Sequence, residues 1–178
     1  MIFILLIQKL KNREESAFKE LVFSFSKRLM TVAVLYSKDS EEAKDILQDT
    51  FIKIFENIDK FKGEEEYMFV GWCKRILINL ALTRNSKFYR SLEQSISDEH
   101  SEVSFDSGIL SDLYKEEIIQ VVNELPEGYR QVFALFVIEG YTHKDIALQM
   151  GIKESSSRSK FVRAKRMLQN KIHTFSKV

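Results

Sequence analysis

Between Ser155 and Val178 the only charged side chains are positive. No Asp or Glu occurs there, although the whole chain has 26 acidic residues against 27 Lys and Arg. The basic residues are Arg158, Lys160, Arg163, Lys165, Arg166, Lys171 and Lys177. Lys and Arg neutralise phosphates, and Arg can donate two hydrogen bonds to a guanine edge. A charge run alone is more often a solvated face, so DNA contact needs support from the elements that position these residues.

A helix-turn-helix pattern supplies that support. Thr142 can cap a short helix, with Asp145 three residues later to complete the cap. Gly151 offers the positive φ of a tight turn, and Ile152 fills the corner after it. The residues expected to face inward are Ile146, Ala147, Met150, Phe161, Ala164 and Leu168. Because cap, turn, inner stripe and basic outer face occur together at these spacings, the second helix is predicted to enter a DNA major groove.

The rest of the chain is predicted to be all-α. It has one Pro and six Gly in 178 residues, and apolar residues recur at steps of three and four. Two stripes indicate amphipathic helices: Phe18, Leu21, Val22, Phe25, Leu29, Val32 and Tyr36, then Ala43, Ile46, Leu47, Phe51, Ile54 and Ile58. Asp39 and Glu42 are placed to cap the second of these helices. A third helix is expected from about Tyr67 to Asn85, with Phe69, Trp72, Ile76 and Leu80 on its inner side.

Composition divides the chain into two small helical domains joined by a flexible linker. Helical periodicity covers residues 1–88 and returns over residues 112–178, where Pro126 is expected to begin a helix. Between them, residues 89–111 are acidic and rich in Ser, which is typical of a solvated segment. This acidic stretch should avoid phosphate, so nucleic-acid contacts are expected in the two domains.

Several classes of protein are disfavoured by the residues present. Cys73 is the single cysteine and the three histidines are scattered, so neither a disulfide nor a metal site is expected. No phosphate-cradling glycine loop or nucleophile elbow occurs, so no catalytic residue and no cofactor is predicted. The apolar run Met1 to Ile7 is far shorter than a membrane span and is interpreted as the buried start of the first helix. We expect a cytoplasmic protein without stable membrane insertion.

The chain resembles the extracytoplasmic-function (ECF) sigma factors of bacterial RNA polymerase. Residues 125–133 and 140–152 are similar to region four of that family, and residues 43–51 and 69–81 are similar to region two. The resemblance implies a non-enzymatic protein that binds core RNA polymerase, recognises promoter DNA in double- and single-stranded form, and helps to melt it. It also implies control by an anti-sigma factor that engages the two domains.

The resemblance also assigns residues to three surfaces. The face that docks on the polymerase is matched by Asp45, Gln48, Asp49 and Lys53. The surface that melts the minus-ten element and captures a flipped base is matched by Lys74, Arg75, Ile76 and Asn79. Contacts to the minus-thirty-five element are matched by Ser156, Arg158, Ser159, Lys160, Val162, Arg163 and Arg166. Trp72 is interpreted as a packing residue, because a lone Trp on an inner stripe is usually core.

Two positions depart from the family pattern at the start of the recognition helix. Lys153 stands where a small hydroxyl residue commonly caps the helix, and Ser157 stands where Val normally packs inward. Ser157 must therefore find a hydrogen bond or destabilise the fold. His143 has no second metal ligand nearby and is expected on the surface.

Two other functions remain possible on the sequence. One is a helix-turn-helix regulator whose N-terminal bundle senses a ligand or dimerises without engaging core polymerase. The other is an all-helical enzyme or adaptor with an incidental basic tail, for which no catalytic motif is present.

Overall fold

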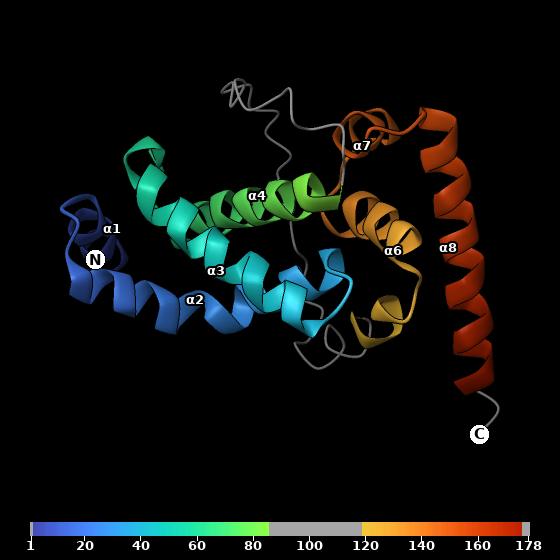
Figure 1. Cartoon of the computed structure of the whole chain (residues 1–178), viewed down its shortest axis with the longest axis horizontal. Coiled ribbons are helices and arrows are strands. Elements are labelled where there is room, and N and C mark those ends of the chain that lie inside the picture. Colours follow the sequence, from blue (N-terminus) through green and yellow to red (C-terminus); the bar gives the residue numbers. More distant parts are fainter. Residues whose placement is uncertain (1, 86–118, 176–178) are drawn as a thin grey trace. The chain divides into compact units, whose positions relative to one another are not determined.

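The computed structural model describes residues 2–85 and 119–175, which fall into two compact units divided at Arg84 and Asn85 (Figure 1). All regular structure in these ranges is helical, which confirms the all-α prediction. The predicted linker, residues 89–111, lies outside the described residues, so its boundaries stay a prediction. Each unit is described by itself below.

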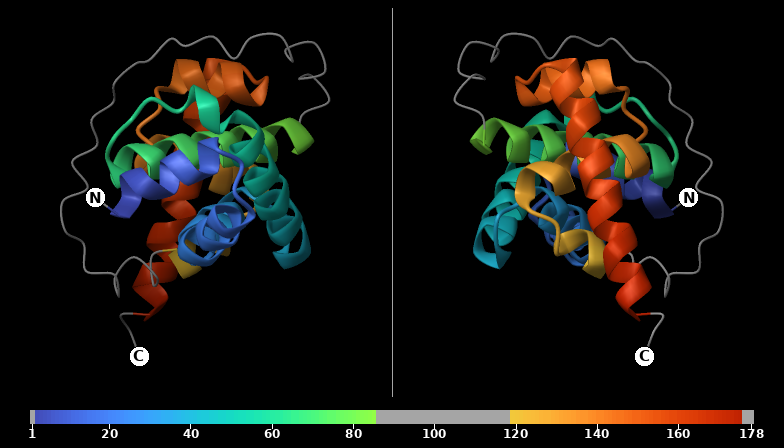
Figure 2. Two further views of the ribbon diagram at one scale, coloured as in Figure 1. Left: turned by 90° about the vertical axis from the view of Figure 1, so that its left-hand side faces the viewer. Right: turned by 90° about the vertical axis from the view of Figure 1, so that its right-hand side faces the viewer.

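The first unit consists of four helices and one short helical turn. They are α1 (Ile2–Lys11), α2 (Glu15–Tyr36), α3 (Ser40–Asn57), the 3-10 turn η1 (Ile58–Lys60) and α4 (Glu66–Asn85). The long helices α2 and α3 pack along each other, and α1 packs on α2 (Figures 1 and 2). Both predicted stripes point into this unit, since Leu21 and Leu29 of α2 and Ile46 and Ile54 of α3 are fully buried.

The predicted cap of α3 is confirmed with one change. The Asp39 carboxylate accepts a hydrogen bond from the Glu42 N–H at 2.8 Å. The Glu42 carboxylate in turn accepts from the N–H of Lys38, at 2.6 Å, rather than from Asp39 itself. Both exposed amides are satisfied, so the helix start is stabilised as the spacing predicts.

The inner face of α4 was predicted wrongly by about one position. Phe69 is buried as expected, but the residues that follow it in the core are Cys73, Leu77, Ile78, Ala81 and Leu82. Trp72, Ile76 and Leu80 are half-buried instead. The buried set starts with steps of four from Phe69, whereas the predicted set began with a step of three. Trp72 still packs as predicted, with its ring against Phe61 and Phe69 at 5.6 and 5.9 Å between centroids.

The apolar start of the chain is only partly buried, which corrects a second prediction. Leu6, Ile7 and Leu10 of α1 lie in the core, whereas Ile4 and Leu5 are exposed. A helix presents one side to the bundle, so a continuous apolar run necessarily leaves some of its members outside.

The turn from α1 to α2 places an arginine where helices usually end in glycine. Arg13 has φ of 62°, in the left-handed region. Its N–H bonds the Leu10 carbonyl at 3.0 Å, and the next N–H bonds the Lys9 carbonyl at 3.1 Å, which is the Schellman arrangement. The Arg13 side chain ties this turn to the end of α3. It bonds the Phe55 carbonyl, lies 5.1 Å from the Phe55 ring centroid and pairs with Asp59 at 2.5 Å.

The second unit contains the predicted helix-turn-helix. Its helices are 119–123, α6 (Glu127–Phe133), a π-helical continuation of α6 labelled η3 (Ala134–Ile138), α7 (His143–Met150) and α8 (Glu154–Phe175). Pro126 precedes α6 as its N-cap rather than forming its first residue, which places it one position before the prediction. Buried Arg130 donates to the carbonyls of Asn123 and Leu125, at 3.0 and 3.4 Å, and so joins α6 to the preceding turn.

The helix-turn-helix has the local geometry that its sequence predicts. The Thr142 hydroxyl accepts from the Asp145 N–H, and the Asp145 carboxylate accepts from the Thr142 N–H, both at 3.2 Å. Gly151 has φ of 63°, and the N–H of Ile152 returns to the Ala147 carbonyl at 3.0 Å. The turn between α7 and α8 is therefore closed by a backbone bond around a left-handed residue, a conformation that Gly adopts without strain.

His143 is buried, so its expected place on the surface was wrong. Its ring stacks on Phe136 with centroids 4.4 Å apart, and its Nδ1 lies 2.9 Å from the Ser157 hydroxyl oxygen. Ser157 is fully buried on α8 and has thereby found the hydrogen bond that the sequence required. Burial lowers the pKa of His143 below its usual 6.5, and the positive charge of Arg158 lowers it further.

The first prediction concerns Arg13. Replacing it with Ala removes the side-chain contacts and keeps the left-handed strain, which costs about 1–2 kcal/mol in a residue with a Cβ. Replacing it with Gly removes the same contacts but also the strain. We expect Arg13→Gly to be more stable than Arg13→Ala by about 1 kcal/mol in urea denaturation of the full chain. Equal stability of the two variants would contradict this.

The second prediction concerns pH. Because the native pKa of His143 is lowered, the unfolded chain binds more protons below the usual value of 6.5. The stabilisation is therefore complete above that pH and is lost as pH falls from it towards the native pKa. We expect the free energy of unfolding to fall in this window. His143→Asn, which keeps a hydrogen-bonding group without titrating, should show a shallower fall. Parallel pH curves for the parent and the variant would contradict a contribution of His143 to the pH dependence.

Candidate nucleic-acid interface

The structure brings all seven predicted minus-thirty-five residues onto α8, a helix of 22 residues. Its buried stripe is Ser157, Ala164 and Leu168. The predicted residues lie outside that stripe: Arg158, Ser159, Val162, Arg163 and Arg166 are exposed, and Ser156 and Lys160 are half-buried. One cationic surface results, with exposed Val162 among the charges as an apolar group that can contact a thymine methyl.

The best candidate for a base contact, Arg158, already holds an acidic partner. Its guanidinium pairs with the Glu154 carboxylate one turn earlier, at 2.5 Å. Both side chains are well exposed, so the pair contributes little to stability and can exchange for contacts with DNA. Arg158 lies near the start of α8, where base readers of helix-turn-helix proteins lie.

Two other cations of α8 meet an aromatic residue of α6 that the sequence interpretation did not single out. The ammonium of Lys160 lies 5.3 Å from the ring centroid of Tyr129, within cation-π range. Hydrogen bonding and the positive charge of nearby Arg163, with a smaller contribution from Lys160, lower the pKa of Tyr129 below its usual 10.0. The signal in the sequence was a Tyr in the first turn of a helix predicted to pack beside a basic one.

The predicted minus-ten residues of α4 do not all share one side. Arg75 and Asn79 are exposed and stand four residues apart, so their side chains are neighbours. Half-buried Ile76 borders them. Lys74 is offset by about 100° from Arg75, on the side away from Ile76, because each residue of an α-helix turns by that angle. The coherent surface on α4 is therefore Arg75, Asn79 and Ile76, with Lys74 at its margin.

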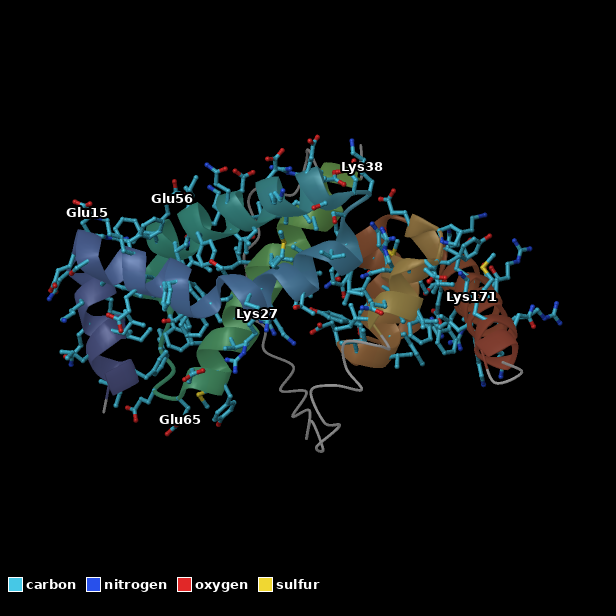
Figure 3. The ribbon with its side chains drawn as sticks, turned by 90° about the horizontal axis from the view of Figure 1, so that it is seen from below. Glu15, Lys27, Lys38, Glu56, Glu65 and Lys171 are labelled. Atoms are coloured by element: carbon cyan, nitrogen blue, oxygen red, sulfur yellow. The ribbon has the colours of Figure 1, made fainter. Side chains whose placement is uncertain are left out.

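The predicted polymerase-docking residues form one face of α3. Asp45, Gln48 and Lys53 are exposed. Asp49 is half-buried and pairs with Arg84, close to the end of α4. Lys53 pairs with Glu56 at 3.0 Å, and Figure 3 shows Glu56 on the outer side of α3.

Sequence reasoning missed Ile52 on this α3 face. It is 45% exposed and lies between Gln48 and Asp49 around the helix. An apolar residue outside the buried stripe was the available signal. It gives the face an apolar centre surrounded by polar groups, which is the composition of a docking surface.

Other kinds of site find no support in the part of the chain that is described. No group of three His, Cys, Asp or Glu side chains is placed to hold a metal there. Cys73 is buried, and loss of hydration raises the pKa of its thiol far above the ordinary value, so it is an unreactive core residue. None of the described helices is long and apolar enough to span a bilayer.

Comparison with known proteins covers both units. Sigma-70 region 2 matches residues 21–90, and sigma-70 region 4 matches residues 115–168. The RNA polymerase sigma-H factor of Pseudomonas aeruginosa is 26% identical over 172 residues, which span 90% of this chain and 88% of that protein. The ECF RNA polymerase sigma-E factor of Haemophilus influenzae is 27% identical over 182 residues, which span 94% of this chain and 93% of that protein.

Among solved structures, the chain is similar to CnrH in its complex with the cytosolic domain of CnrY. The identity is 20% and the TM-score 0.49, over 96% of this chain and 97% of that one. The two sigma-70 regions occur in order, one in each compact unit, and together they match more than two thirds of the chain. The chain therefore belongs to the sigma-70 family, as a sigma factor of the ECF type.

Proposed function

We propose that this sigma factor binds core RNA polymerase, recognises a promoter at two elements and helps to open the upstream edge of the transcription bubble. The observation that carries the proposal is that exposed residues suited to contact nucleic acid gather in both units, on the α8 surface and on the α4 surface. A repressor or activator needs only the first. The chain performs no catalysis in this proposal and needs no cofactor, since the polymerase forms the phosphodiester bonds.

The α8 surface reads the minus-thirty-five element as duplex DNA. Arg158 releases Glu154 and donates two hydrogen bonds to a guanine, while Ser156, Ser159 and Val162 contact neighbouring base edges. Lys160, Arg163 and Arg166 bind phosphates and fix the register of the helix in the groove.

The α4 surface acts on the minus-ten element. The Asn79 amide can hydrogen-bond the edge of an unpaired base, and Arg75 with Lys74 holds the displaced backbone. Ile76 covers the face of an exposed base. Favourable contacts of this kind offset an unstacking cost of a few kcal/mol per base, so melting requires no nucleotide hydrolysis.

The α3 face docks on the polymerase. Ile52 supplies the apolar centre, and Asp45, Gln48, Asp49 and Lys53 supply the charged and polar rim that sets specificity. Since Asp49 also pairs with Arg84, docking on α3 is linked to the end of α4. The protein accordingly acts in the cytoplasm, where core polymerase and promoter DNA are found.

An anti-sigma factor completes the proposed set of partners. A protein that covers the α3 face or the α8 surface would block polymerase or promoter binding without altering the fold. The measurement is run-off transcription with the candidate regulator added in equimolar amount. A regulator that binds the chain yet leaves the transcript unchanged is not its anti-sigma factor.

The third prediction tests the function itself. Purified full chain and core polymerase should give promoter-dependent run-off transcripts from genomic fragments that include the DNA upstream of its own gene. Arg158→Ala should weaken the free energy of promoter binding by about 1–3 kcal/mol and relax the sequence preference at one base pair. Lys19→Ala is the control, because Lys19 is an exposed cation paired with Glu15 far along the chain from the three surfaces. Operator binding by the protein alone, with no transcript, would instead support the ordinary regulator.

The fourth prediction separates docking from melting. Asp45→Arg reverses a charge on the α3 face and should weaken core binding by about tenfold, measured by fluorescence anisotropy of labelled chain. Asn79→Ala should leave core binding unchanged but reduce permanganate reactivity of thymines in the minus-ten element. The assignments fail if Asp45→Arg binds core normally or if Asn79→Ala melts DNA as well as the parent.

A further inference from the structure

The cations of the α8 surface differ in their partners, and two of them share Tyr129. Arg158 pairs with a carboxylate of its own helix, whereas Lys160 and Arg163 both contact the tyrosine on α6. Within the described residues, no acidic side chain lies in salt-bridge distance of Lys160 or Arg163. Their contacts with Tyr129 therefore hold them without neutralising their charge.

Lys160 and Arg163 stand three residues apart and project on the same side of α8. The ring centroid of Tyr129 lies 5.3 Å from the Lys160 ammonium, and Arg163 acts on its hydroxyl at the other end of the ring. One aromatic side chain thus touches both cations, at its face and at its polar end. A phenol suits this task because its face attracts cations and its oxygen accepts hydrogen bonds.

Gly128, next to Tyr129, leaves room for this arrangement. A Cβ added at Gly128 would lie 3.0 Å from the Lys160 Nζ, closer than nearly all real Cβ contacts. The atom that would have to move is the end of a flexible side chain rather than backbone. Gly128 and the ring of Tyr129 thus both border the ammonium of Lys160.

We infer that Tyr129 is a positioning residue for DNA binding, which holds Lys160 and Arg163 in place for two phosphates of the minus-thirty-five duplex. The inference rests on the proposed use of α8 in promoter recognition. Long cationic side chains lose rotamer freedom when they bind, and a side chain already held in its bound geometry loses less. Because phosphates are identical along the backbone, the gain is in affinity for any duplex rather than in choice of sequence.

The experiment measures binding of the full chain to a promoter duplex and to an unrelated mixed-sequence duplex over a series of KCl concentrations. Tyr129→Leu should weaken binding to both by about three- to tenfold and reduce the slope of log K against log salt by up to about one. Tyr129→Phe keeps the ring face and loses the hydroxyl, so its affinity should lie between those of Leu and the parent. A loss confined to the promoter duplex would overturn the inference.

Gly128→Ala is the matched variant, since it leaves Tyr129 and the core untouched. Ala stabilises a helix relative to Gly, so the melting temperature should stay the same or rise. Affinity for duplex DNA should nevertheless fall by about two- to fivefold, because the added methyl displaces Lys160 from the ring. If the role of Tyr129 is purely structural, Gly128→Ala should leave the affinity for duplex DNA unchanged.

A third readout is the titration of Tyr129, followed by ultraviolet absorbance as the difference between the full chain and Tyr129→Phe. The pKa should lie below 10.0 in the parent and move back towards that value in Arg163→Ala. An unchanged pKa in that variant would show that the contact is absent in solution.

Two reference variants separate this inference from the proposed function. If Lys160→Ala and Arg163→Ala leave duplex affinity unchanged, α8 does not use these cations on DNA and the proposed phosphate contacts fail. If both weaken binding while Tyr129→Leu and Gly128→Ala do not, the phosphate contacts stand and the positioning role of Tyr129 is wrong.

Discussion

The packing of Phe161 against α6 and α7 is the interaction on which the DNA-binding unit depends. Its ring lies 4.6 Å from that of Phe136, 6.1 Å from that of Phe133 and 5.7 Å from that of His143. A helix that carries a cationic surface can bury only a narrow stripe, so few residues hold it to the rest of the unit. The aromatic cluster reinforces the buried stripe of Ser157, Ala164 and Leu168, while the opposite side of α8 stays exposed.

The same constraint explains what could and could not be predicted. Local rules were sufficient for the capping box of Thr142 and Asp145 and for the positive φ of Gly151, because both depend on residues close in sequence. They were insufficient for His143, whose burial is decided by Phe136 and Ser157 from neighbouring elements. Ser157 looked anomalous at an inward position, and only the structure shows that it and His143 satisfy each other.

The apolar periodicity predicted correctly that the helices exist, but it was less reliable for which face of a helix is buried. It placed α4 within one residue of its start, yet turned its inner face towards Trp72 and Ile76 instead of Cys73 and Leu77. Apolar residues surround much of that helix, so a pattern of threes and fours fits more than one face. The same holds for the candidate surfaces. Ile52 and Tyr129 can be assigned to a surface only once the structure shows which residues lie beside them. Which residues belong to which surface came from the resemblance, whereas their exposure and pairing came from the structure.

The π-helical stretch Ala134–Ile138 has a consequence for the length of this segment. Such a turn holds one residue more than an α-helical turn, and the bonds from Glu139 to the Ala134 carbonyl and from Tyr141 to the Leu135 carbonyl span it at 3.0 and 2.9 Å. Deletion of one residue would let the stretch relax into an ordinary α-helix. The residues after it would then keep nearly their present direction, whereas a deletion in a regular α-helix turns everything after it by about 100° and shifts it by about 1.5 Å along the axis. Deletion within this stretch and deletion elsewhere before Gly140 are thus unequal hazards, since only the first leaves the direction of the helix-turn-helix nearly unchanged.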